Sequence, residues 1–196
     1  IYLLPDDAPV GMDLMEYLGL PETLFEVEIT PNRPDLLSHF GIARELAANL
    51  KTEARFPNEP KLVESGADSS AKASGNVADA GDCPLYSCRV LEGVKVGPSP
   101  RWLKERLERV GQRSINNVVD VTNYILMELG QPLHAFDFAL LSGHRVEVRR
   151  AKDGEKLPLL DGTERTLTPD ALVIADAEKA VALAGAATAD FGEAAG

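Results

Sequence analysis

A stretch of small and polar residues near the middle of the chain divides it into two parts. Residues 65–82 are mostly Ser, Gly and Ala, and such residues bury too little apolar surface to offset the entropy lost on ordering. We therefore predict a flexible linker over residues 56–82. At 196 residues the chain is long enough for one domain and part of another, so residues 1–55 and 83–196 are predicted to be separate units.

The charge balance limits the kind of partner. Twenty Lys and Arg against 31 Asp and Glu give a formal net charge of -11, which argues against broad electrostatic binding of nucleic-acid phosphates. Any RNA contact must then be local and geometrically specific. No run of residues approaches the roughly 18 apolar residues of a membrane-spanning helix. Residues 1–7 have no basic segment or long apolar stretch, so nothing in them has the pattern of a secretory signal.

The two cysteines bear on the compartment. Cys83 and Cys88 have no second Cys or His pair at zinc-site spacing, so we predict structural thiols in a reducing compartment rather than a metal site. A reducing compartment predicts a cytoplasmic protein.

The first part, residues 1–55, combines a short strand with a helix. Phe25, Val27 and Ile29 alternate with glutamates, which predicts a half-buried strand. The prolines of residues 31–34 disfavour helix. Apolar residues have helical spacing over residues 35–50, which predicts a helix there. This part is predicted to be a small helical segment.

The second part opens with a strand and two helices. Residues 86–96 have strand character. Ser99 is the predicted cap of a first helix and Pro100 its first residue, where the missing N–H has no consequence. A second helix is predicted over 117–129, with Gly130 ending it in a left-handed conformation.

Short strands fill the rest of the second part. The segments with strand character are 146–148, 156–160, 164–168, 171–175 and 180–184. Asp161-Gly162 is a typical hairpin turn between two of them. Helices followed by short strands predict an α+β fold, in which two or more helices pack on an antiparallel, barrel-like sheet.

The densest group of polar side chains lies in residues 114–124. Asn116, Asp120 and Asn123 are spaced by four and three residues, so a helix would place them along one stripe. The alternative is that Asn116 or Asn117 caps the helix while the other side chains bond nearby backbone.

His134 follows a Gln-Pro turn, with Asp137 three residues further on. The imidazole is a candidate hydrogen-bond donor or general base, or a structural histidine. No Ser or Cys nucleophile has a base at a recognisable spacing, and the sequence contains neither a phosphate-binding loop nor a dinucleotide fingerprint. We therefore expect no covalent intermediate and no cofactor bound by this chain itself.

Over residues up to Gly185, the chain resembles the beta-chain family of the bacterial phenylalanyl-tRNA synthetases. The blocks that carry the resemblance are Glu28-Ile29-Thr30-Pro31-Asn32-Arg33-Pro34-Asp35, Gly41-Ile42-Ala43-Arg44-Glu45-Leu46-Ala47, Ile115-Asn116-Asn117-Val118-Val119-Asp120-Val121-Thr122-Asn123-Tyr124, Gln131-Pro132-Leu133-His134-Ala135-Phe136-Asp137, Leu160-Asp161-Gly162 and Leu172-Val173-Ile174-Ala175. Several blocks in the same order are more specific than one short motif.

The resemblance implies a division of labour. Residues 1–55 would be the later half of a small helical domain, and residues 83–196 a C-terminally truncated editing domain that hydrolyses tyrosine wrongly attached to tRNA(Phe). Aminoacylation with ATP and Mg²⁺ would belong to the whole α2β2 enzyme, formed with an alpha chain. The alternative is a non-catalytic module that contacts tRNA or assembles subunits.

The resemblance also implies the site. Thr122, Asn123 and His134 would line the editing pocket, with Ala184 and Gly185 as another wall. His134 and Asn123 would orient a water and the terminal adenosine, while the Ala184-Gly185 segment approaches the amino acid. The match ends after Gly185, and the family's hydroxyl-sensing glutamate would lie beyond the last residue, so we expect an incomplete pocket.

Overall fold

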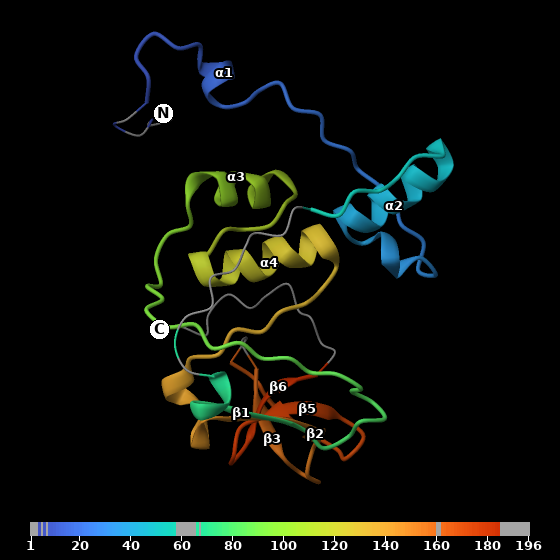
Figure 1. Cartoon of the computed structure of the whole chain (residues 1–196), viewed down its shortest axis with the longest axis vertical. Helices are drawn as coiled ribbons and strands as arrows, with labels where there is room; N and C mark the ends of the chain where they lie inside the picture. The colour runs from blue at the N-terminus through green and yellow to red at the C-terminus, as the bar shows by residue number, and fades with distance from the viewer. Residues whose placement is uncertain are drawn as a thin grey trace.

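A computed structural model describes residues 4, 6, 8–57, 66, 68–159 and 162–184. The helices in this part of the chain are α1 (Leu14–Tyr17), α2 (His39–Leu50), α3 (Arg101–Arg109) and α4 (Asn117–Leu129), with short 3-10 turns η1 (Pro34–Leu36), η2 (Ser69–Ala71), η3 (Phe138–Leu140) and η4 (Ser142–His144). The strands are β1 (Ser74–Val77), β2 (Arg145–Arg150), β3 (Lys156–Pro158), β4 (Glu164–Thr166), β5 (Leu172–Ala175) and β6 (Ala180–Leu183). Helices α2, α3 and α4 lie on one side of the molecule and the sheet on the other (Figure 1).

The sheet confirms the predicted α+β class but differs from the predicted sheet in two ways. Its strand order is β1-β2-β5-β6, and β3 pairs with β4 in a separate hairpin. Among the described residues the four strands form an open sheet rather than a closed barrel, and β1 runs parallel to β2 instead of antiparallel. The pairs β2–β5, β5–β6 and β3–β4 are antiparallel, as predicted.

Strand β1 lies within the segment predicted to be a linker. Its residues, Ser-Gly-Asn-Val, offer one apolar side chain, Val77, which packs against the sheet. The strand forms because its backbone groups find partners on the edge of β2, and such pairing does not depend on apolar side chains. The division of the chain at residues 56 and 82 stays a prediction.

Both faces of the sheet are covered by apolar side chains. Val173 and Ala175 of β5 belong to one buried cluster, completed by the β3–β4 hairpin. Ile174 points to the opposite face and joins Val146 and Val148 of β2 in a second cluster. Successive side chains of a strand point to opposite faces, so a strand buried on both faces is apolar throughout. We call the second group, Val146, Val148, Ile174 and Ala182, the lower-face cluster.

Helices α3 and α4 confirm the helical predictions, with one correction. Leu103 and Leu107 are buried, as their spacing predicts, and α4 ends at Gly130 with φ +77. The predicted cap of α3 is wrong: the N-cap is Pro100, and no side chain caps the helix. The Ser99 hydroxyl instead donates to the carboxylate of Asp120 in α4 at 2.5 Å. A hydrogen bond to a charged acceptor is stronger than one between neutral groups.

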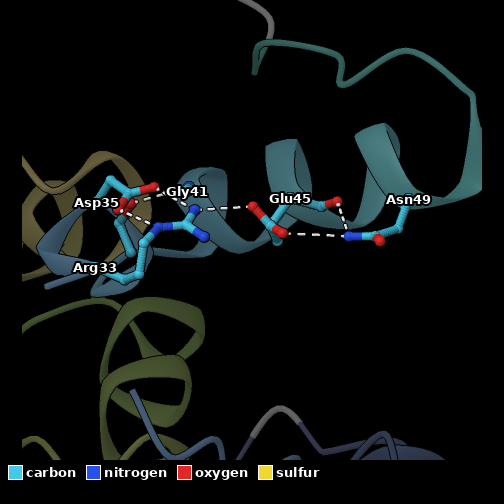
Figure 2. Close-up of polar contacts among 6 residues, drawn as sticks. Arg33, Asp35, Gly41, Glu45 and Asn49 are labelled. Carbon is cyan, nitrogen blue, oxygen red and sulfur yellow. Dashed lines mark hydrogen bonds and ion pairs between the residues drawn. The ribbon is translucent and has the colours of Figure 1, made fainter. Parts of the chain in front are cut away.

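Helix α2 begins later than predicted, after a tight turn shown in Figure 2. Ser38 is its N-cap and accepts from the amide of Gly41 at 3.1 Å. The guanidinium of Arg33 donates to Asp35 and to Glu45, both at 2.8 Å, and so joins the turn to the helix. A Cβ on Gly41 would lie 1.8 Å from the carbonyl oxygen of Asp35, so only glycine fits there.

Two predicted strands are absent. Residues 25–29 form no strand, and the side chains of Phe25 and Val27 are 81% and 50% exposed. Residues 86–96 also form no strand, although Tyr86 packs against the lower-face cluster. Alternation of apolar residues favours a strand, but a strand also needs a neighbour for its backbone hydrogen bonds. No described strand pairs with either segment.

Candidate functional site

The buried side chains of α4 are polar. Asp120 is fully buried and accepts three hydrogen bonds, from the hydroxyls of Ser99 and Ser114 at 2.5 Å and from the amide of Ile115 at 2.8 Å. These donors come from the segments that precede α3 and α4. Since all three bonds stay within the protein, Asp120 joins the two helices and is not free to act on a substrate.

The asparagines at the start of α4 have structural roles as well. Asn116 is the N-cap, and its side chain accepts from the amides of Val118 and Val119 at 3.0 Å. Asn117 accepts from the amide of Gly97 at 3.1 Å and donates to the carbonyl of Lys95 at 2.9 Å.. For these side chains the structural interpretation of the polar block is confirmed.

Thr122 and Asn123 differ in whether their side chains are already hydrogen-bonded within the protein. The Thr122 hydroxyl donates to the carbonyl of Val119 at 2.7 Å, one turn back on the same helix. Asn123 is 6% exposed, and its side-chain amide makes no hydrogen bond to another described residue. Neither atom of this amide is fully buried without a partner, so the amide can be satisfied by water or by a ligand. Asn123 is therefore the side chain of α4 best suited to contact a ligand.

His134 lies in the segment between α4 and η3 and is half-buried. Its ring stacks on Phe136 with centroids 6.1 Å apart and an interplanar angle of 14°. Burial lowers the pKa of His134, so the imidazole is neutral at neutral pH and has one donor and one acceptor nitrogen. The carboxylate of Asp137 caps η3 by accepting from the amide of Ala139 at 2.9 Å.

Ala184 is half-buried at the end of β6. Its amide donates to the carbonyl of Leu172 at 2.9 Å, and its side chain packs against the lower-face cluster. Phe136, whose ring stacks on that of His134, packs against the same cluster. Gly185 lies outside the described residues. Ala184 and Phe136, the stacking partner of His134, therefore pack against the same face of the sheet.

The polar side chains of α4 are not joined to His134 by the contacts of the described residues. Among the described residues, the hydrogen bonds and ring contacts do not join Asn123 to His134, so a pocket containing both is a proposal. The described part of the chain holds no group of three or more His, Cys, Asp or Glu arranged for a metal ion. Cys83 and Cys88 are free thiols, and no described helix is long and apolar enough to cross a bilayer.

A groove between α1 and α3 was not predicted from the sequence. It is lined by Glu16, Tyr17, Leu18, Gly19, Arg101, Trp102, Glu105, Arg106 and Arg109. The signal that could have found it is the spacing of Trp102 and Arg106, one turn apart on an amphipathic helix whose apolar positions are Leu103 and Leu107. Those apolar positions place Trp102 and Arg106 away from the buried stripe.

Comparisons with known proteins identify a family and its relatives. A family described as "B3/4 domain" matches residues 82–191. The chain is 54% identical over 185 residues to the phenylalanine–tRNA ligase beta subunit of Geobacter metallireducens, 53% identical to that of Geobacter sulfurreducens and 49% identical to that of Moorella thermoacetica. Each match covers 94% of this chain and 23% of the relative, so the chain spans about a quarter of the length of these curated relatives.

Proposed function

The chain belongs to the B3/4 domain family, and from this premise we propose that it serves a phenylalanine–tRNA ligase as the editing part of its beta subunit. The reaction would be hydrolysis of tyrosyl-tRNA(Phe). The names of the relatives support the ligase, while the editing step rests on the side chains of α4 and of the segment that follows it. Charging with ATP and Mg²⁺, an alpha-subunit partner, tRNA(Phe) and a cytoplasmic location belong to the proposal for the whole ligase.

Discrimination between the two amino acids gives such a site its purpose. A pocket shaped for phenylalanine cannot strongly reject an analogue that merely adds a hydroxyl. A second site with a buried polar partner for that hydroxyl reverses the preference, because phenylalanine would leave the partner unpaired. Sorting by a second site therefore requires a buried polar partner for the tyrosine hydroxyl, a role separate from that of the groups that hold the water and the ester.

The observation that carries the proposal is Asn123, a residue 6% exposed whose side-chain amide makes no hydrogen bond to another described residue and is still reached by solvent. We propose that it binds the terminal adenosine or the attacking water. His134, neutral because burial lowers its pKa, would accept a hydrogen bond from the water and orient it towards the ester carbonyl. Ala184 would approach the amino acid from β6, together with Gly185, and Thr122 would support the α4 wall.

The reaction then needs positioning more than a protein nucleophile. Water adds to the ester carbonyl, the bond between the carbonyl carbon and the ribose oxygen breaks, and the ribose oxygen takes up a proton as tyrosine leaves. Holding the water and the ester in the reactive geometry lowers the barrier without a covalent intermediate.

Deacylation of tyrosyl-tRNA(Phe) by the purified chain tests the proposal. The wild-type chain should release tyrosine faster than buffer, and His134→Ala and Asn123→Ala should each slow release by about 10- to 100-fold, as expected for the loss of a positioning group. His144→Ala is the matched control, since His144 is exposed and stacks on Phe138.

Two results would contradict different parts of the proposal. Release no faster than the buffer blank would remove the editing activity of this chain. An active wild type whose rate is unchanged in both variants would show that the site is elsewhere.

A subunit-assembly role is the second candidate. The exposed apolar side chains of the first part favour it: Phe25 is 81%, Leu50 72% and Leu37 64% exposed, and exposed apolar groups in number mark interaction surfaces. Co-purification of the chain with a ligase alpha subunit, reduced by Leu50→Ser, would support assembly; co-purification that Leu50→Ser leaves unchanged would count against this surface.

A further inference from the structure

Helix α2, from the first part of the chain, lies against the C-terminal end of α4 (Figure 1). Ser38, the N-cap of α2, is 6% exposed, and a Cβ added to Gly130 would lie 3.3 Å from its side chain. Gly130 is the residue that ends α4. The start of one helix and the end of the other are therefore in close contact, although residues 51–116 separate the two helices along the chain.

A hydrogen bond also joins the two helix ends. The last four carbonyls of a helix have no amide partner within the helix. In α4, the carbonyl of Leu126 accepts from the amide of Gly130 at 2.8 Å, and the carbonyl of Met127 lies 2.8 Å from Nδ1 of His39. Because a carbonyl oxygen only accepts, Nδ1 is the donor. His39, the first residue of α2, thus caps the last turn of α4 from another helix.

The support on which His39 stands is itself held in place. The guanidinium of Arg33 donates to Asp35 in the preceding turn and to Glu45 in α2, both at 2.8 Å (Figure 2). These two contacts fix the turn against the helix. The donor at His39 is therefore presented to α4 from a braced helix start and not from a free end of the chain.

His134 follows the capped end of α4 after a short segment. Gly130 precedes it by four residues, and Phe136, on which its ring stacks, packs against the lower-face cluster two residues later. Pro132 restricts the backbone between these two points. A short segment tied at both ends has few conformations open to it, so the place of the His134 ring depends on where α4 ends.

We propose that His39 is a positioning residue of the editing site, because it holds the last turn of α4 and so fixes the segment that carries His134. The inference rests on the proposed function, since the reaction is the one proposed for His134. Without the His39 donor, the last turn of α4 opens more often and the imidazole no longer stays aligned with the water. Residues 1–55 thus contribute to the site without touching the substrate.

Substitutions of similar shape test the hydrogen bond. His39→Asn places an amide nitrogen on the γ carbon, where Nδ1 of His39 is attached, whereas His39→Leu has nearly the same shape and no donor. His39→Ala also lacks the donor and adds no exposed apolar surface. His39 is exposed, so the variants should fold, as urea denaturation would check. Arg44→Leu, at another exposed position of α2, is the matched control.

NMR of the purified chain measures the effect without an activity assay. His39→Leu and His39→Ala should speed exchange of the Gly130 amide by about threefold to tenfold, as expected for the loss of one hydrogen bond. Burial lowers the pKa of His134 from its ordinary 6.5, and release of the segment should raise that pKa back towards 6.5. His39→Asn and Arg44→Leu should leave both quantities as in wild type.

Deacylation of tyrosyl-tRNA(Phe) measures the consequence for the site, under conditions in which each variant is fully folded. His39→Leu should lower kcat by about threefold to tenfold and leave KM near the wild-type value, because His134 acts on the water and not on binding of the tRNA. His39→Asn should restore kcat.

The outcomes separate this inference from the editing proposal. Wild-type behaviour of Gly130 and His134 in His39→Leu would overturn the inference, even if His134→Ala slows deacylation. Equal changes in His39→Leu and His39→Asn would also overturn it, because the imidazole ring and not its hydrogen bond would then matter. A wild-type chain that releases no tyrosine, with Gly130 and His134 still responding to His39→Leu, would contradict the editing proposal and support the link from His39 to the His134 segment.

Discussion

Glu155, in the turn between β2 and β3, shows how one carboxylate joins distant parts of the sheet. Its oxygens accept from the Arg149 guanidinium at 2.7 and 2.8 Å, and from the amides of Lys152 and Ala180 at 2.9 Å. The side chains of Arg149 and Glu155 are 14% and 9% exposed. The hydrogen bonds from Arg149 lower the pKa of Glu155 to about 2.

The pKa of Glu155 predicts how stability depends on pH. Because the folded pKa, about 2, lies below the ordinary value of 4.5, the ionised carboxylate stabilises the fold fully above the ordinary value, and the contribution is lost as pH falls towards 2. Glu155→Gln should lower the free energy of unfolding by about 3 kcal/mol at neutral pH. It should also flatten the dependence of that free energy on pH in the acidic range, as urea denaturation at several pH values would measure.

A neighbouring ion pair supplies the control. Lys156 and Glu164 pair across the β3–β4 hairpin at 2.6 Å, with side chains 65% and 52% exposed. Water screens such a pair, so Glu164→Gln should change stability little. A loss for Glu164→Gln as large as that for Glu155→Gln would show that burial of the Arg149–Glu155 pair is not what matters.

The polar side chains of residues 116–123 show which features of the candidate site can be predicted from the sequence alone. The sequence predicted that a helix would place Asn116, Asp120 and Asn123 along one stripe. Asp120 and Asn123 are both buried in α4, whereas Asn116 lies outside the helix as its N-cap, with extended backbone. The sequence could not say which of them has spare hydrogen-bonding capacity, because the partners of Asp120 include Ser99, from a segment 21 residues away. Only the assembled structure separates Asp120, whose bonds are complete, from Asn123.

At the scale of elements, the turn into α2 depends on close approach of two backbone segments. Ser38 and Gly41 start the helix, and the Asp35 carbonyl lies where a side chain on residue 41 would begin. Arg33 closes the turn from the side through Asp35 and Glu45 (Figure 2). The turn also contacts α4, since a Cβ on Gly130 would lie 3.3 Å from Ser38.

Gly41→Ala should disrupt this turn. The added carbon would lie 1.8 Å from the Asp35 carbonyl oxygen, so the backbone must shift and the Arg33 contacts weaken. We expect the free energy of unfolding to fall by about 2 kcal/mol, typical of overpacking, when measured by urea denaturation. Ala43→Gly is the control for helix propensity and should cost about 1 kcal/mol; equal stability of Gly41→Ala and wild type would contradict the close contact.

At the scale of the whole molecule, backbone hydrogen bonds are unevenly distributed. Strands β2 and β5 each have a neighbour on both sides. Residues 21–30 form no helix or strand, and no amide among them donates to the backbone of another described residue. The central strands should therefore be among the last parts to open, and residues 21–30 among the first.

Hydrogen exchange followed by mass spectrometry tests this contrast. Peptides from β2 and β5 should exchange at least about 100-fold more slowly than a peptide covering residues 21–30, since opening of the central strands requires global unfolding. The peptide containing β1, which has one neighbouring strand, should lie between them. Protection of residues 25–29 equal to that of β2 would show that the alternating segment finds a strand partner in solution.

The sequence by itself determined those features that depend on neighbours along the chain. Helix α4 has the predicted ends, because Asn116 caps it through amides two and three residues on and Gly130 adopts the left-handed conformation that ends it. The β3–β4 hairpin and the buried strand β5 also follow from short-range pattern.

The tertiary structure decided whatever requires a partner distant in sequence. Residues 74–77 are a strand because β2 offers them an edge, whereas residues 25–29, with the better strand pattern, have no described neighbour and stay irregular. Ser99 bonds Asp120 rather than its own helix, and Trp102 is held open by Tyr124 and Arg106. The physical reason is the same in each case. A polar group is stable where it finds a hydrogen-bond partner, and the tertiary structure determines which groups distant in sequence come within reach of each other.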